Sequence, residues 1–239
     1  MNRARLNAED FARADALLAV PPGVARAVCT VEAPDGGFDA GGRPRILFEG
    51  HHFARMTGGR FNATHPDISY PRWTRARYAK GSNPDARNAG EHQRLARAVA
   101  LDKRAALSSA SWGRFQIMGS NYALAGHGTL QEFVNAMYRS ESDHLDAFCA
   151  FVRAHPAMHS ALQRLDWTAF ARAYNGPAYA ANAYDAKLAS AYRVWQGKAP
   201  LPDPVPVPTT PAPTTATPAR GLLHWLQLLL ALIFKRKAP

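Results

Sequence analysis

Apolar residues recur every three or four positions through most of the chain before residue 197, which is the spacing of one buried helix face. Residues 8–19 follow Asn7, a residue type that caps helix N-termini, and residues 22–33 begin at Pro22, which favours a first helical turn. The same pattern predicts further helices over residues 91–106, 130–139, 141–154, 157–164, 167–174 and 178–195. We therefore expect a mostly helical protein.

Two stretches before residue 197 depart from the helical pattern. Residues 45–49 form a short apolar run after the Gly41-Gly42 turn, which predicts a strand within a small β-hairpin. Residues 57–90 are polar and basic without clear periodicity, and we expect a long ordered loop region there. The fold class predicted from these patterns is mostly α (α+β), with one small hairpin among helices.

The composition changes abruptly after residue 197, where prolines alternate with Val, Thr and Ala. Proline lacks a backbone donor and has a fixed φ, so residues 198–219 are predicted to be a semi-rigid, polyproline-like linker. A ligand for a proline-reading domain is the alternative interpretation. The linker divides the chain into a folded body, residues 1–197, and a tail, residues 220–239.

The tail is apolar between Leu222 and Phe234 and has cations at both ends, at Arg220 and at residues 235–237. As a helix this run would reach roughly 20 Å, short of the ~30 Å hydrocarbon core of a bilayer, so a standard transmembrane span is not expected. We predict an interfacial amphipathic helix whose cations meet the phosphates of an anionic membrane or of lipopolysaccharide. A helix docked on the chain's own body, or one that drives oligomerisation, is the alternative.

Composition narrows the classes of protein that the chain can be. Its 239 residues, 47% of them hydrophobic, can bury a sizeable core, which excludes a disordered chain or a disulfide-stapled miniprotein. The net charge of +11 predicts a polyanionic partner such as nucleic acid, an anionic cell surface or a membrane. Two isolated cysteines, Cys29 and Cys149, favour buried thiols and a reducing site of synthesis. Glu9, Asp10 and Asp15 interrupt the N-terminus, so no export signal is predicted.

Two glutamates stand where catalytic carboxylates could act. Glu32 ends the apolar helix predicted over residues 22–33, and desolvation there would raise the pKa of its carboxyl, as protonation of a glycosidic oxygen near neutral pH requires. Glu49 closes the predicted strand, and carboxylates on a helix end and a neighbouring hairpin can converge across a cleft, as glycoside hydrolysis generally uses. The alternatives are a solvated helix-end residue for Glu32 and, for Glu49, a carboxylate that binds loop amides and organises the turn.

Several separated motifs resemble the phage endolysin N-acetylmuramidase family, in the family's order and over roughly residues 15–195. They are Val31-Glu32 with Gly37-Phe38, the run from Gly42 to Phe53, His65-Pro66-Asp67-Ile68-Ser69, Ser111-Trp112-Gly113-Arg114-Phe115-Gln116-Ile117-Met118-Gly119 and Ala173-Tyr174-Asn175-Gly176-Pro177. The resemblance implies a lysozyme-like fold in residues 1–197, and hydrolysis of the β-1,4 bond between N-acetylmuramic acid and N-acetylglucosamine in bacterial peptidoglycan. It implies no cofactor. Such an enzyme is made in the host cytoplasm without a signal peptide and acts on the cell wall, in the periplasm.

The same resemblance assigns roles to individual residues. Glu32 matches the family's catalytic general acid, and Glu49 matches a second acidic position that acts as nucleophile, base or organiser. Candidates for binding the sugar are Gln116, Tyr174, Asn175 and Trp112. Their ordinary alternatives are an aromatic core segment and an Asn-Gly helix stop.

Two rival functions stay open from the sequence. A lytic transglycosylase also relies on one essential glutamate but closes the sugar on itself, and a membrane-active protein would kill bacteria without catalysis. His155 and His159 have helical spacing for a metal, but no acidic partner completes a zinc pattern, and we predict no metal. The run Arg72-Trp73-Thr74-Arg75-Ala76-Arg77-Tyr78-Ala79-Lys80 interleaves cations and aromatics. We interpret it as a loop lining the glycan cleft rather than a nucleic-acid site or a merely solvated loop, and expect no specific nucleic-acid partner.

Overall fold

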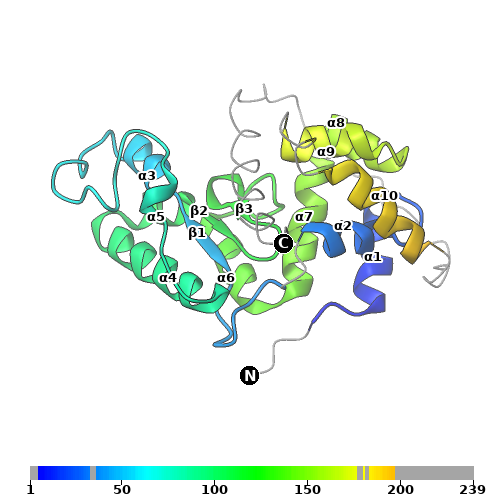
Figure 1. Ribbon diagram of the computed structural model, residues 1–239, viewed down its shortest axis with the longest axis horizontal. Coiled ribbons are helices and arrows are strands. Elements are labelled where there is room, and N and C mark those ends of the chain that lie inside the picture. The colour runs from blue at the N-terminus through cyan, green and yellow to red at the C-terminus, as the bar shows by residue number, and fades with distance from the viewer. Residues whose placement is uncertain (1–4, 33–35, 177–179, 181–182, 197–239) are drawn as a thin grey trace. The chain divides into compact units, whose positions relative to one another are not determined.

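The structure is a computed structural model that describes residues 5–32, 36–176, 180 and 183–196 (Figure 1). The chain divides into two compact units. Of the described residues, the first unit contains residues 5–6 and 36–151, and the second contains residues 7–32 and those from 152 to 196. The predicted linker, residues 198–219, and the predicted tail helix, residues 220–239, lie outside the described residues.

The first unit is built around a small antiparallel sheet of three strands in the order β1-β2-β3. Strand β1 (Ile46–Phe48) pairs with β2 (Ala110–Trp112), which forms a hairpin with β3 (Ile117–Met118). The register places Leu47 opposite Ser111. The helices of this unit are α3 (Gly50–Met56), α4 (Pro84–Leu101), α5 (Lys103–Ser108), α6 (Leu130–Arg139) and most of α7 (Glu141–Arg153), with short 3₁₀ turns η1 (Arg75–Arg77) and η2 (Gly119–Asn121).

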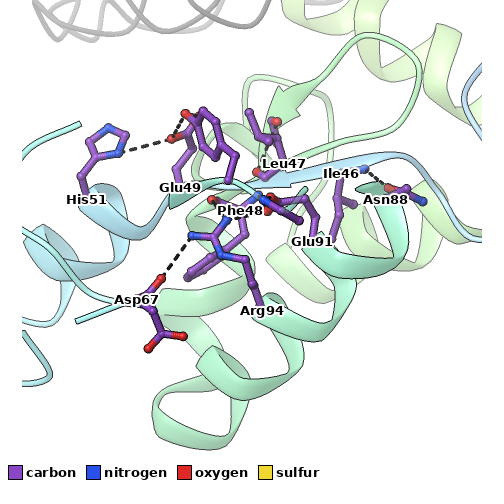
Figure 2. Close-up of polar contacts among 12 residues, drawn as sticks. Ile46, Leu47, Phe48, Glu49, His51, Asp67, Asn88, Glu91 and Arg94 are labelled. Atoms are coloured by element: carbon purple, nitrogen blue, oxygen red, sulfur yellow. Dashed lines mark hydrogen bonds and ion pairs between the residues drawn. The ribbon is translucent and has the colours of Figure 1, made fainter. Parts of the chain in front are cut away.

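Side chains from α4 bind the edge of β1 that faces away from β2. The backbone N–H of Ile46 donates to Oδ1 of Asn88 at 3.0 Å, and that of Phe48 donates to Oε2 of Glu91 at 3.1 Å (Figure 2). Alternate residues of a strand direct their N–H groups to the same edge, so the two bonds satisfy successive donors on one edge. The helix therefore fixes the strand in place as a neighbouring strand would.

The second unit consists of helices α1 (Ala8–Leu18), α2 (Val24–Glu32), α8 (Pro156–Gln163), α9 (Trp167–Asn175) and α10 (Tyr184–Trp195). Helix α10 packs along α2, as Figure 1 shows, and α8 packs on α9. Val24, Val28, Phe170 and Leu188 are fully buried in this unit and form part of its core. Among the described helices, none combines the length and the hydropathy that a membrane crossing requires.

The structure confirms a mostly helical fold with a small sheet, and most helices lie close to the predicted ranges. The single helix predicted over residues 91–106 is wrong, because α4 ends and α5 begins at Asp102, and α3 was not predicted. The predicted location of the hairpin is wrong. The Gly41-Gly42 turn joins Phe38 and Pro44 through a single antiparallel bridge, and the strand at residues 46–48 instead pairs with a strand more than sixty residues later. The predicted loop over residues 57–90 also contains the start of α4, where Asn83 caps the helix and Pro84 opens it.

Candidate active site

Glu49 lies where β1 ends and α3 begins, and the residue is 2% exposed. Its backbone N–H donates to the carbonyl of Ser109 at 2.9 Å, which ties it to the end of the sheet. The next residue must be glycine, because a Cβ on Gly50 would lie 2.4 Å from the carbonyl oxygen of Ile68 and from the ring of Tyr70. This close approach explains why the glutamate is followed by glycine in the motif.

The carboxyl group of Glu49 binds a tyrosine rather than the loop amides. The hydroxyl of Tyr78 lies 2.8 Å from Oε2 and 3.0 Å from Oε1 of Glu49, and accepts a hydrogen bond from Nε1 of Trp73 at 2.7 Å. Burial raises the pKa of Glu49 to about 7, because the lowering by the Tyr78 hydrogen bond and by Arg94 does not offset desolvation and the charge of Glu91. The carboxyl can therefore both hold and release a proton near neutral pH.

His51 stands beside Glu49 on α3 (Figure 2), with Nδ1 at 3.3 Å from Oε2. Burial and the nearby charge of Arg55 lower the pKa of His51 to about 4, so its imidazole is neutral at pH 7. The contact is therefore a packing contact between a neutral ring and the carboxyl group, and not an ion pair.

A buried ion pair between Glu91 and Arg94 on α4 lies close enough to Glu49 for both charges to act on its pKa. Nη1 of Arg94 lies 2.7 Å from Oε2 of Glu91, and the two residues occupy successive turns of the inner face of α4. Glu91 also accepts from the N–H of Ala79 at 2.6 Å, and Arg94 donates to the carbonyl of Phe48 at 3.2 Å. A buried pair with further hydrogen bonds of this kind is stable only as a complete set. It joins the end of β1 to the segment that carries Tyr78.

Glu32 belongs to the second unit, where it is the last residue of α2 and is 4% exposed. The expectation that a solvated helix end explains this residue is therefore wrong. Burial and then the charge of Glu32 raise the pKa of Tyr174 on α9, and the same two causes raise the pKa of Tyr184 on α10. The carboxyl group thus lies near two buried phenols.

Helix α2 is fixed at both ends. The buried carboxylate of Asp15 accepts from the N–H groups of Gly23 and Ala25, both at 2.7 Å, and so caps the first turn. Near the other end, Nε1 of Trp195 donates to Oγ1 of Thr30 at 3.2 Å. Helix α2 therefore presents Glu32 from a rigid support.

The glycine-rich stretch that follows Glu32 in the motif is held by α7. The N–H of Gly37 donates to Oε1 of Glu141 at 2.6 Å, while Oε2 of Glu141 lies 2.9 Å from Nη1 of Arg114. A Cβ on Gly37 would lie 2.4 Å from Nδ1 of His144, so no larger residue fits there without displacing that ring. One buried glutamate thus joins the Gly37-Phe38 motif to the motif that contains Arg114.

The predicted sugar-binding residues divide between the two units. In the first, Gln116 has φ +50° and donates from Nε2 to the carbonyls of Gly113 at 2.8 Å and Arg45 at 3.1 Å, while Trp112 is 1% exposed. The Gln116 side chain therefore holds the β2–β3 turn, and the indole of Trp112 donates to the carbonyl of Leu107 at 3.1 Å. In the second, Tyr174 is buried near Glu32, and Asn175 ends α9 with a side chain outside the described residues. Their binding of sugar stays a prediction.

Sequence reasoning missed Tyr78, Glu91 and Arg94 as partners of Glu49. A usable signal was present for two of them, because Glu91 and Arg94 share the buried face of α4 with Leu95 and Ala98. Charged residues on an otherwise buried helix face indicate a satisfied polar network.

Of the histidine pair considered for a metal, His159 follows Pro156 at the start of α8 and contacts the backbone of α1. Nε2 of His159 lies 2.7 Å from the carbonyl oxygen of Leu18, which gives the ring a structural partner. Over the residues that the structure describes, no group of three or more His, Cys, Asp or Glu side chains has the arrangement of a metal site.

Comparisons with known proteins agree with the motifs. The family model for N-acetylmuramidases matches residues 21–196. Among solved structures, the crystal structure of the Burkholderia AP3 phage endolysin is similar, with a TM-score of 0.74 and 37% sequence identity, over 82% of this chain and 73% of that chain. A search of curated proteins finds no match.

Proposed function

Because the chain belongs to the N-acetylmuramidase family and is a peptidoglycan hydrolase of the phage endolysin type, we propose that it cleaves the β-1,4 bond between N-acetylmuramic acid and N-acetylglucosamine. The observation that supports this most directly is the buried Glu49, whose pKa of about 7 suits proton transfer near neutral pH. Glu32 supplies a second buried carboxyl on a rigid helix end. Two carboxyl groups with different environments are what hydrolysis of a glycosidic bond requires.

In the proposed reaction, Glu32 is the general acid that donates its proton to the leaving glycosidic oxygen. Glu32 is buried at the end of α2, which holds the donor in a fixed position. Glu49 is the general base, which takes a proton from the water molecule that attacks the anomeric carbon. A nucleophilic carboxylate would need to stay ionised well below neutral pH, so the raised pKa of Glu49 favours the base over the nucleophile.

A lytic transglycosylase is the second candidate for the same bond, and it needs no base for an attacking water. Mass spectrometry of purified peptidoglycan digested by the protein separates the two, because hydrolysis leaves reducing ends and transglycosylation leaves 1,6-anhydro ends that lack one water. We expect reducing ends.

The test of the catalytic assignment uses Glu32→Gln, which keeps the shape of the side chain and removes its proton. We expect a loss of at least ~10² in the rate of muropeptide release with an unchanged circular dichroism spectrum. Glu9→Gln, at an exposed position on α1, is the matched control and should retain the wild-type rate. Wild-type activity in Glu32→Gln would refute the general-acid role.

For residues 220–239 we propose contact with an anionic membrane or with lipopolysaccharide, supported by the cations at both ends of the apolar run. A chain that ends at Trp195 should lose binding to anionic liposomes and lysis of intact Gram-negative cells from outside, while it keeps activity on purified peptidoglycan. Equal lysis by the shortened chain would refute the membrane role. If Glu32→Gln still kills cells, the killing is membrane activity that does not need catalysis.

A further inference from the structure

The segment between Asp67 and Asp85 contains no acidic residue but carries Arg72, Arg75, Arg77 and Lys80, all of them exposed. We refer to residues 71–80 as the basic segment. In the part of the chain that the structure describes, none of these four cations forms an ion pair. Other arginines of the same unit do bind carboxylates: Arg43, Arg45, Arg60, Arg94, Arg97, Arg114 and Arg139.

The basic segment is fastened directly to Glu49. Its two aromatic residues are joined by the hydrogen bond from Trp73 to Tyr78, and Tyr78 in turn binds the Glu49 carboxyl group. The N–H of Tyr78 also donates to the carbonyl of Arg75 at 3.2 Å, which closes the η1 turn between them. The aromatic side chains thus face the protein, while the cations are exposed on the same segment whose Tyr78 binds the candidate catalytic carboxyl group.

The position of these cations indicates the chemistry of the ligand. In peptidoglycan the N-acetylated sugars are uncharged, and the carboxyl group of N-acetylmuramic acid is joined to the stem peptide by an amide bond. The free carboxylates of the polymer therefore belong to the stem peptides, which branch from the glycan at each of these amide bonds. Arginine is well suited to such groups, because its guanidinium can bind a carboxylate through two parallel hydrogen bonds.

We propose that the basic segment binds the carboxylates of peptidoglycan stem peptides next to the cleavage site, so that the protein recognises peptide-bearing glycan rather than bare sugar. This proposal rests on the proposed function, since it places the stem peptide beside the bond that is cut. Trp73 and Tyr78 make the contact rigid, and binding of a peptide carboxylate is thereby coupled to the group that holds Glu49.

The test compares two substrates that differ only in charge. Sacculi are N-acetylated to block free amines, and one half is then amidated with a carbodiimide and ammonia, which neutralises the stem carboxylates and leaves the glycan intact. The variant is Arg72→Gln with Arg75→Gln, and the matched control is Lys103→Gln with Arg104→Gln, two exposed cations on α5 of the same unit. Arg77 is left in place because its guanidinium lies over the ring of Tyr70 at 6.0 Å.

We expect the variant to cleave free-carboxylate sacculi roughly threefold to tenfold more slowly than wild type, the effect of two exposed ion pairs, and to match wild type on amidated sacculi. The control should match wild type on both. Equal rates for variant and wild type on both substrates, or an equal loss on both, would overturn the proposal. An equal loss would mean that the arginines act on Glu49 or on the fold.

Binding gives a second readout that does not depend on cleavage. With Glu32→Gln as background, co-sedimentation with free-carboxylate sacculi should weaken when Arg72 and Arg75 are replaced, and co-sedimentation with amidated sacculi should not. A wild-type protein that cuts neither substrate would refute the proposed function, while this binding difference would still decide the role of the basic segment. If the two arginines instead affect only retention on a single-stranded oligonucleotide, the segment is a nucleic-acid site and the proposal is wrong.

Discussion

Replacement of Glu49 by glutamine should make the protein inactive and, above neutral pH, more stable. The buried carboxyl has a pKa of about 7 in place of its ordinary value of 4.5, so the folded state holds a proton that the unfolded state has released. The stability that this group contributes is fully present below about pH 4.5 and is lost as the pH rises through 7. Glutamine has nearly the same shape, does not ionise, and still offers an oxygen to Tyr78.

The size of this change in unfolding free energy follows from the pKa of Glu49. At 1.36 kcal/mol per pKa unit, the change from 4.5 to about 7 corresponds to about 3 kcal/mol of stability lost by the wild type between acidic and alkaline pH. Glu49→Gln does not lose this stability, because glutamine does not ionise. The difference in unfolding free energy between variant and wild type should therefore move by about 3 kcal/mol in favour of the variant as the pH rises. Other titrating groups, Asp15 among them, contribute equally to both proteins and cancel.

The assay is urea unfolding of both proteins at about pH 4 and about pH 8, together with muropeptide release at neutral pH. We expect the variant to lose activity and to gain stability relative to wild type at the higher pH. This result would identify the Glu49 carboxyl as a functional group whose burial lowers the stability of the folded protein. A stability difference that stays the same at both pH values would refute the reasoning, because the buried carboxyl would then not be neutralised by its surroundings. An active Glu49→Gln would show that Glu49 only organises the turn, and Glu9→Gln is the control for a carboxylate in solvent.

Two further predictions concern the supports of the two glutamates. Tyr78→Phe removes a hydrogen bond that lowers the pKa of Glu49, so the acidic limb of the pH–activity profile should move up by roughly one unit; an unmoved limb would show that the hydroxyl does not control Glu49. Asp15→Ala leaves the N–H groups of Gly23 and Ala25 without their acceptor, and urea unfolding should show a loss of about 2–4 kcal/mol, partly restored in Asp15→Asn. A loss below about 0.5 kcal/mol would mean that α2 does not depend on this cap.

The sequence predicted most helices because their apolar spacing and caps are local signals, as at Asn7. It located Glu32 and Glu49 because each ends a short apolar element. It could not supply the partner of β1, since the choice between a local hairpin and the distant β2 depends on tertiary packing. Tyr78 escaped notice for the same reason: its hydroxyl meets Glu49 only after the intervening chain has folded back.

The binding of β1 by side chains of α4 has a consequence for self-association. An unpaired strand edge is a template on which another chain can add a strand, and proteins commonly protect such edges. Here Asn88 and Glu91 occupy the donors of β1 without offering a new edge of their own, so growth of the sheet stops at the helix. The arrangement that positions Glu49 thus also protects the protein against aggregation through this strand. A substitution at Asn88 or Glu91 would therefore both disturb the position of Glu49 and uncover the edge of β1.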